Sequence, residues 1–198
     1  MQNNFCDGEV NLFPDFLSEA ERSIYLERLK TEIEWKHEPI LMFGKLVMQP
    51  RLTAWYGDPG ARYRYSGMTQ DPLMWIDALF KLKSKIEQQT GASFNAVLLN
   101  QYRNQKDSMG WHRDNEKELG LEPIIASLSL GETRRFLLRK HASVSAMRKT
   151  EAIELTGGSL LIMKGRSQSE WEHSLPKTTQ SRGLRINLTF RLIKSELS

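Results

Sequence analysis

Residues 184–192 read LRINLTFRL, and this stretch decides the class of fold. Apolar and polar side chains alternate along it, as expected for a β-strand whose successive side chains point to opposite faces. The polar members of the alternation are Arg185, Asn187, Thr189 and Arg191. Taken alone, four polar groups on one face are typical of a strand with one side in solvent, and the rest of the sequence must decide whether that explanation holds.

Five further segments have a similar character, since each is short, rich in apolar or β-branched residues and bounded by turn residues. They are FNAVLLNQY (94–102), IIASLSL (124–130), RRFLLRK (134–140), EAIEL (151–155) and SLLIM (159–163). Many short strands after a helical start are typical of a β-sandwich or barrel with flanking helices. We therefore expect an α+β fold.

The first part of the chain contains two helical patterns. Ser18 followed by Glu21 forms a capping box and opens the first helix. Asp71 and Pro72 read as the N-cap and first position of a second helix, which should end near Gly91. We expect this second helix to bury four apolar side chains, those of Ile76, Leu79, Phe80 and Ile86.

The composition is that of one ordinary globular domain. The chain has 198 residues, of which 39% are hydrophobic and 26% charged, so a sizeable core can form. It contains no internal repeat and no Pro/Gly/Ser-rich linker. We expect one domain over 1–198, with 1–91 as a helical and hairpin elaboration and 92–198 as the strand-rich core.

The number of cysteines and the length of apolar runs indicate the cellular compartment of the protein. Cys6 is the single cysteine, so no internal disulfide can form, and a reducing compartment fits best. No apolar run approaches the roughly 18–20 residues needed to span a bilayer, and no secretory signal pattern opens the sequence. We expect an intracellular protein that does not enter membranes, cytoplasmic if bacterial and nuclear if eukaryotic. The net charge of +4 is compatible with a polyanionic partner without being specific for one.

One pair of residues has the spacing of metal ligands. On an extended segment, the side chains of His112 and Asp114 point the same way and can share one ion. A third ligand must come from elsewhere, and His173 lies just after the strand SLLIM and a loop. Two histidines and one carboxylate suit non-heme iron(II) with open positions, although a zinc hydrolase uses similar ligands.

The arginines of residues 184–192 favour the oxygenase over the zinc hydrolase. Arginine binds carboxylates bidentately, and 2-oxoglutarate has two carboxylates to hold. Arg185 and Arg191 share one face of the strand, roughly 20 Å apart along it, so their long side chains can lean toward opposite ends of a small dianion. Asn100 and Tyr102 likewise share one face of another strand and can complete the pocket.

These motifs together resemble the AlkB family of DNA and RNA dealkylases over nearly the whole chain. The match is carried by Asn100-Gln-Tyr102, His112-Arg-Asp114, His173-Ser-Leu-Pro176 and the RxNxTFR signature at residues 185–191. The stretches at residues 49–57 and 123–129 look especially like eukaryotic-type homologues that repair DNA and RNA. The resemblance implies a double-stranded β-helix, or jelly-roll, core.

The resemblance also implies a role for each matching residue. Iron(II) would be bound by His112, Asp114 and His173. Arg185, helped by Tyr102, would pair with the distal carboxylate of 2-oxoglutarate. The end of 2-oxoglutarate near the metal would be held by Arg191 and Asn100, with Asn187 and Thr189 also lining this pocket. The family reaction uses O₂ to oxidise an N-alkyl carbon and gives the plain base, formaldehyde, succinate and CO₂.

A further group of residues is expected to contact the nucleic acid, because a base must leave the duplex to reach a buried iron. In relatives, an aromatic at the position of Tyr65 stacks the base against the first iron-ligand histidine. Asn115 replaces an aspartate common in the family. The remaining contacts are a duplex wedge at Phe43-Gly44-Lys45, a base-contacting aromatic at Tyr63, a phosphate contact at Arg51 and a base-edge acid at Glu116.

The leading hypothesis is therefore a monomeric dealkylase that acts on 1-methyladenine and 3-methylcytosine in single- or double-stranded DNA, and in RNA as a further substrate. Two alternatives remain open. One is a related 2-oxoglutarate oxygenase whose substrate is RNA or protein. The other is a non-catalytic nucleic-acid-binding module with a vestigial site.

Overall fold

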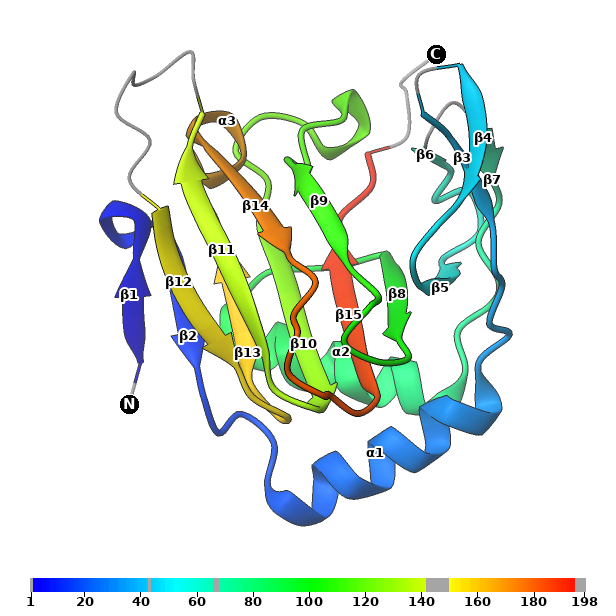
Figure 1. Ribbon diagram of the computed structural model, residues 1–198, viewed down its shortest axis with the longest axis horizontal. Helices are drawn as coiled ribbons and strands as arrows, with labels where there is room; N and C mark the ends of the chain where they lie inside the picture. Colours follow the sequence, from blue (N-terminus) through cyan, green and yellow to red (C-terminus); the bar gives the residue numbers. More distant parts are fainter. Residues whose placement is uncertain (1, 43, 66–67, 142–149, 195–198) are drawn as a thin grey trace.

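Two antiparallel sheets form the body of the protein in a computed structural model, which describes residues 2–42, 44–65, 68–141 and 150–194. The larger sheet runs β1 (Asn3–Phe5), β2 (Val10–Phe13), β13 (Leu160–Met163), β10 (Ile125–Gly131), β15 (Arg185–Arg191), β8 (Ala96–Tyr102) and β5 (Leu52–Gly57). The smaller sheet runs β12 (Thr150–Leu155), β11 (Arg134–Lys140), β14 (Trp171–Leu175) and β9 (Met109–His112). Figure 1 shows the smaller sheet lying across the larger one, which confirms the expected α+β jelly-roll arrangement.

Shorter elements complete the fold. Two two-stranded hairpins stand apart from the sheets: β3 (Pro39–Met42) with β4 (Lys45–Met48), and β6 (Tyr63–Tyr65) with β7 (Met68–Gln70). The helices are α1 (Glu19–Glu32), α2 (Asp77–Thr90) and the one-turn α3 (Ser167–Glu170), with 3-10 turns η1 (Cys6–Gly8) and η2 (Lys117–Leu119). Three strands of the larger sheet, β1, β2 and β5, come from the first 91 residues. None of the helices in the described ranges has the length and apolar character needed to cross a membrane.

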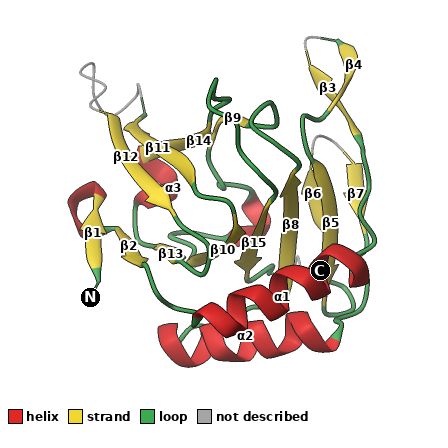
Figure 2. Cartoon of the chain, turned by 60° about the horizontal axis from the view of Figure 1, so that its bottom comes forward, coloured by secondary structure: helices red, strands yellow, loops and turns green. Residues whose placement is uncertain are grey.

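The two longer helices cover one face of the larger sheet, as Figure 2 shows. Their apolar side chains and those of β8, β10 and β15 form one buried cluster, which includes Leu29, Leu82 and Leu188. The predicted capping box is confirmed at the start of α1. The Ser18 amide donates to the Glu21 carboxylate at 2.8 Å, and the Glu21 amide donates to the Ser18 hydroxyl at 3.3 Å.

The predicted start of the second helix is wrong. The helix begins at Asp77, because Leu73 is held in extended backbone along the edge of β5. The Leu73 amide donates to the Trp55 carbonyl at 3.0 Å, and the Gly57 amide donates to the Leu73 carbonyl at 2.9 Å. Phe80, expected inside, is 54% exposed, whereas the helix does end at Gly91 with a left-handed cap as expected.

Strand β15 lies between β10 and β8, and all seven of its residues are buried. Ile186, Leu188 and Phe190 pack in the cluster under the helices. Because side chains alternate along a strand, the four polar residues face the other way, toward the smaller sheet. The solvated face that alternation alone suggested is therefore wrong, and the polar face is interior.

Candidate metal and cosubstrate site

Three potential metal ligands meet between the two sheets. His112 is the last residue of β9, and its partner across the strand pair is His173 of β14. Asp114 follows two residues after His112. The ligand atoms of the three side chains all lie within 4.8 Å of one another. The structure thus brings together all three residues that the sequence predicted as ligands.

The ring of His112 is oriented for coordination. Its Nδ1 lies 2.9 Å from the carbonyl oxygen of Gly110, and since a carbonyl can only accept, Nδ1 carries the proton. The lone pair therefore lies on Nε2, which is 4.0 Å from Oδ1 of Asp114. Metal-bound histidines commonly donate their second ring nitrogen to a main-chain carbonyl in this way.

Asp114 is a buried carboxylate held in its ionised form. Its Oδ2 accepts a hydrogen bond of 2.8 Å from Nη2 of Arg191, and its Oδ1 remains on the side of His112. Burial raises the pKa of Asp114, but the positive charge of Arg191, the nearby imidazoles of His173 and His112, and the hydrogen bond from Arg191 outweigh this effect and bring the pKa to about 2. The backbone amide of Asp114 is also fixed, because it donates to Oε1 of Gln168 at 3.0 Å.

His173 is held neutral in the interior. Burial, followed by the neighbouring His112, lowers the pKa of His173 to about 3, because a protonated imidazole would lose its hydration there. The two imidazole ring centroids are 4.2 Å apart. A neutral imidazole is the form that binds a metal, so two imidazoles and one carboxylate fit the ligand set of non-heme iron(II).

A polar strip crosses three adjacent strands beside this cluster. Tyr102 of β8 is paired with Arg185 of β15, and Asn100 is paired with Asn187. Asn187 donates to the Ser127 hydroxyl of β10 at 2.8 Å. Thr189 lies on the same face of β15 and donates to Oδ1 of Asn187 at 3.1 Å. The six residues expected to hold the cosubstrate therefore line one continuous inner surface; they are Asn100, Tyr102, Arg185, Asn187, Thr189 and Arg191.

Arg185 fits a carboxylate at the far end of this strip. The side chain is 2% exposed, its Nη2 donates to the Ser129 hydroxyl at 2.9 Å, and its Nε is buried with no hydrogen-bond partner among the described residues. Burial lowers the pKa of Arg185 to about 10, which still leaves the guanidinium charged at neutral pH. A buried cation with an unused donor is the feature that a dicarboxylate such as 2-oxoglutarate would satisfy.

Known proteins resemble this chain in sequence and in fold. The sequence profile of the 2OG-Fe(II) oxygenase superfamily matches residues 9–191. The chain is 43% identical over 193 residues to "Alpha-ketoglutarate-dependent dioxygenase alkB homolog 3" of Rattus norvegicus, covering 94% of this chain and 64% of that protein. It is 37% identical over 196 residues to "DNA oxidative demethylase ALKBH2" of Mus musculus, covering 95% of this chain and 80% of that protein. The chain belongs to the AlkB family.

A solved structure agrees on the fold of this AlkB-family chain. "The structure of OsALKBH1" superposes with a TM-score of 0.63 at 17% sequence identity, covering 97% of this chain and all of the other. The family implies iron(II), 2-oxoglutarate and O₂ as cofactor and cosubstrates, as the sequence motifs predicted. The His112, Asp114 and His173 cluster is of the kind that such a cofactor needs.

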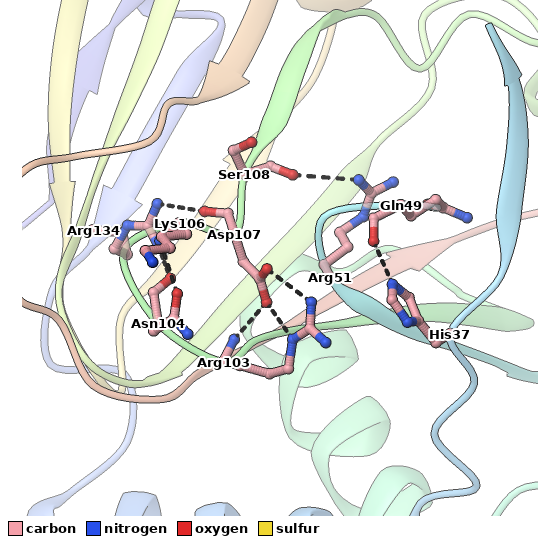
Figure 3. Close-up of polar contacts among 9 residues, drawn as sticks. All are labelled: His37, Gln49, Arg51, Arg103, Asn104, Lys106, Asp107, Ser108 and Arg134. Atoms are coloured by element: carbon pink, nitrogen blue, oxygen red, sulfur yellow. Dashed lines mark hydrogen bonds and ion pairs between the residues drawn. The ribbon is translucent and has the colours of Figure 1, made fainter. Parts of the chain in front are cut away.

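Arg51 occupies a place that the sequence did not predict. It was expected to contact phosphate, but it is 2% exposed, which does not fit that role. Its Nε donates to Oδ1 of Asn100 at 2.7 Å. Its Nη1 donates to the Ser108 carbonyl oxygen at 3.4 Å, as Figure 3 shows. Because Oδ1 of Asn100 is used as an acceptor, the amide nitrogen of Asn100 is left to donate toward the pocket.

The residues expected to contact nucleic acid are placed only in part. Phe43 lies outside the described residues. Gly44, with φ +75°, lies in the turn of the β3–β4 hairpin, and the exposed Lys45 is the first residue of β4. Tyr63 and Tyr65 lie in β6, whose backbone pairs with β7. The other two residues, Asn115 (exposed) and Glu116 (half-buried), follow Asp114 directly, beside the metal ligands.

Proposed function

We propose that this chain oxidatively removes alkyl groups from the nitrogen atoms of nucleobases. The proposed lesions are 1-methyladenine and 3-methylcytosine in DNA, with RNA as a further substrate, and the products are the plain base, formaldehyde, succinate and CO₂. The observation that carries this proposal is the cluster of the half-buried His112 with the buried Asp114 and His173, beside an arginine-lined strip, in a chain 43% identical to an AlkB homologue. Such a reaction is direct reversal of alkylation damage.

The chain's own residues would do four things. His112, Asp114 and His173 would hold the iron, which supplies the O₂ chemistry when it is bound. Arg191 keeps Asp114 ionised and binds its Oδ2, so that Oδ1 of Asp114 is left on the side of His112. Arg185 would bind the distal carboxylate of 2-oxoglutarate. The ring of Phe136, centred 5.3 Å from that of His173, would exclude water from that side of the imidazole.

Nucleic acid fits the surface beside this site better than a small-molecule substrate does. Both hairpins lie at the β5 and β8 side of the larger sheet in the two views (Figures 1 and 2). Strand β4 is exposed along its whole length and presents Lys45 next to Leu46 and Val47. A cation beside apolar side chains suits contact with phosphate and unstacked bases. The proposed lesions weaken base pairing, which lowers the cost of turning the base outward.

A single-turnover assay tests the proposal. The protein is loaded anaerobically with Fe(II) and 2-oxoglutarate, mixed with a single-stranded oligonucleotide containing 1-methyladenine, and exposed to O₂. Mass spectrometry then follows the loss of the methyl group and the formation of succinate. We expect the two to appear together. Succinate without demethylation would contradict the nucleic-acid substrate, and the absence of both products would contradict the oxygenase assignment.

Two alanine variants, one at a predicted metal ligand and one at a control histidine, are compared in this assay. His112→Ala should abolish both products, whereas His141→Ala, at a half-buried histidine beside Glu172 on the smaller sheet, should leave them unchanged. Retained turnover in His112→Ala after metal repletion would contradict the site. Duplex DNA and RNA oligonucleotides with the same lesion establish the strand preference. The monomeric state and the intracellular location stay predictions.

A further inference from the structure

Arg134, the first residue of β11, is a buried arginine outside the set of expected site residues. It is 2% exposed, and its guanidinium hydrogen bonds go to main-chain carbonyl oxygens. Nη1 donates to Asn104 at 3.2 Å, while Nη2 donates to Asp107 at 2.9 Å and to Pro176 at 2.8 Å. Figure 3 shows the contacts with the turn that contains Asn104 and Asp107.

These three carbonyls belong to the two loops that adjoin the metal-ligand strands. The loop 103–108 runs from β8, which ends at Tyr102, to β9, which ends at His112. Pro176 comes directly after β14, which carries His173. One guanidinium therefore joins the loop that precedes β9 to the residue that follows β14.

The same guanidinium also lies close to the cosubstrate strip. The central carbon of Arg134 is 5.8 Å from the centroid of the Tyr102 ring, and that of Arg185 is 5.3 Å from the same centroid. Among the residues that the structure describes, neither arginine forms an ion pair with a carboxylate. Two buried cations against one aromatic ring repel each other, and a bound carboxylate would relieve that repulsion.

We propose that Arg134 is a positioning residue for the distal half of the 2-oxoglutarate pocket. Its hydrogen bonds hold the Tyr102 end of β8 in place, and its charge adds to the attraction that Arg185 exerts on the distal carboxylate. This role rests on the proposed placement of that carboxylate at Arg185 and Tyr102. Arg134 touches neither the metal ligands nor the reacting carbon, so it acts on cosubstrate binding and not on the chemical step.

The test measures 2-oxoglutarate binding without turnover. The anaerobic Fe(II) protein is titrated with 2-oxoglutarate, and the charge-transfer absorption of the complex gives the dissociation constant. We expect Arg134→Met to weaken binding about tenfold, and Arg134→Lys to weaken it less because the charge is kept. The control is Arg135→Met, at the adjacent exposed arginine, which should bind 2-oxoglutarate as the wild type does. In steady state, the KM for 2-oxoglutarate should rise in Arg134→Met while kcat changes less than about threefold.

A second ligand separates positioning from a general loss of structure. The acid 2-oxopentanoate has the same chain length as 2-oxoglutarate but no distal carboxylate, so its affinity should not change in Arg134→Met. Equal weakening for both acids, or wild-type affinity for 2-oxoglutarate in Arg134→Met, would overturn the proposal. Arg185→Met is the reference variant. If it also binds 2-oxoglutarate normally, the placement of the cosubstrate itself is wrong; if it alone binds weakly, only the role of Arg134 is wrong.

Discussion

Replacement of Arg191 by methionine should strongly destabilise the metal-free protein. Arg191 and Asp114 form an ion pair of 2.8 Å in which the side chains are only 4% and 5% exposed. Methionine keeps much of the side-chain volume but removes the charge. The carboxylate of Asp114 is then left buried without its principal counter-ion, and breaking a buried pair from one side costs about 3–5 kcal/mol.

An exposed pair of similar length provides the control. Arg166 and Glu170 are 2.7 Å apart, but the Arg166 side chain is 62% exposed. Exposed pairs contribute about 0.2–1 kcal/mol, so Arg166→Met should cost less than about 1 kcal/mol. The assay is urea unfolding of the metal-free proteins at neutral pH, followed by circular dichroism. The free energies of unfolding are compared at equal denaturant slopes.

Addition of Mn(II), a redox-stable divalent ion, should reduce the difference in free energy of unfolding between Arg191→Met and wild type. A cation at Asp114 supplies the positive charge that the substitution removed, and any ligand that binds only the folded state stabilises it. The reasoning is refuted if Arg191→Met is as stable as Arg166→Met without metal. It is also refuted if Mn(II) leaves the gap between Arg191→Met and wild type unchanged.

Two further predictions concern stability away from the site. The hydrogen bond from Lys85, followed by those of the capping box, lowers the pKa of Glu21 from 4.5 to about 2, so this carboxylate stabilises the fold above pH 4.5 and loses that effect as the pH falls toward 2. Glu21→Gln should therefore lower the free energy of unfolding by about 1 kcal/mol at pH 7, a value discounted for the exposure of the side chain. In unfolding curves at pH 3, the difference in free energy from wild type should be smaller. An equal difference at both pH values would contradict an ionic origin. Gly131→Ala should cost more than about 2 kcal/mol, because φ is +81° and a Cβ there would lie 2.3 Å from the Leu184 carbonyl oxygen. The matched control is Gly8→Ala, where φ is +91° but no atom lies within 4 Å, and equal losses in thermal unfolding would show that the contact has no effect.

Much of the strand framework could be predicted from alternation and composition. RRFLLRK coincides with β11, and the other five predicted strands agree with the structure to within two residues at either end. The strands β9 and β14 were not predicted, because MGWH and WEHSL lack apolar alternation. Inward-facing positions of these two strands hold His112 and His173 in place of apolar residues. The metal ligands themselves therefore interrupt the alternation by which a strand is predicted.

The metal ligands and the two arginines of β15 could be predicted from motifs, whereas the roles of the buried Arg51 and Arg134 could not. A HxD pair and a distant histidine are visible in sequence, and the fold brings them together. Arg51 and Arg134 look like ordinary surface cations in the sequence, because their hydrogen-bond partners are main-chain carbonyls or an amide far along the chain. Only the three-dimensional arrangement shows that both lie behind the cosubstrate strip, Arg51 on Asn100 and Arg134 on Tyr102.

Anomalous X-ray scattering from crystals grown with Mn(II) and 2-oxoglutarate tests most directly whether the site is placed correctly. We predict one anomalous peak bounded by His112, Asp114 and His173, with the distal carboxylate of 2-oxoglutarate at Arg185 and Tyr102. A metal bound at other side chains, or a cosubstrate whose distal carboxylate points away from Arg185, would contradict the account.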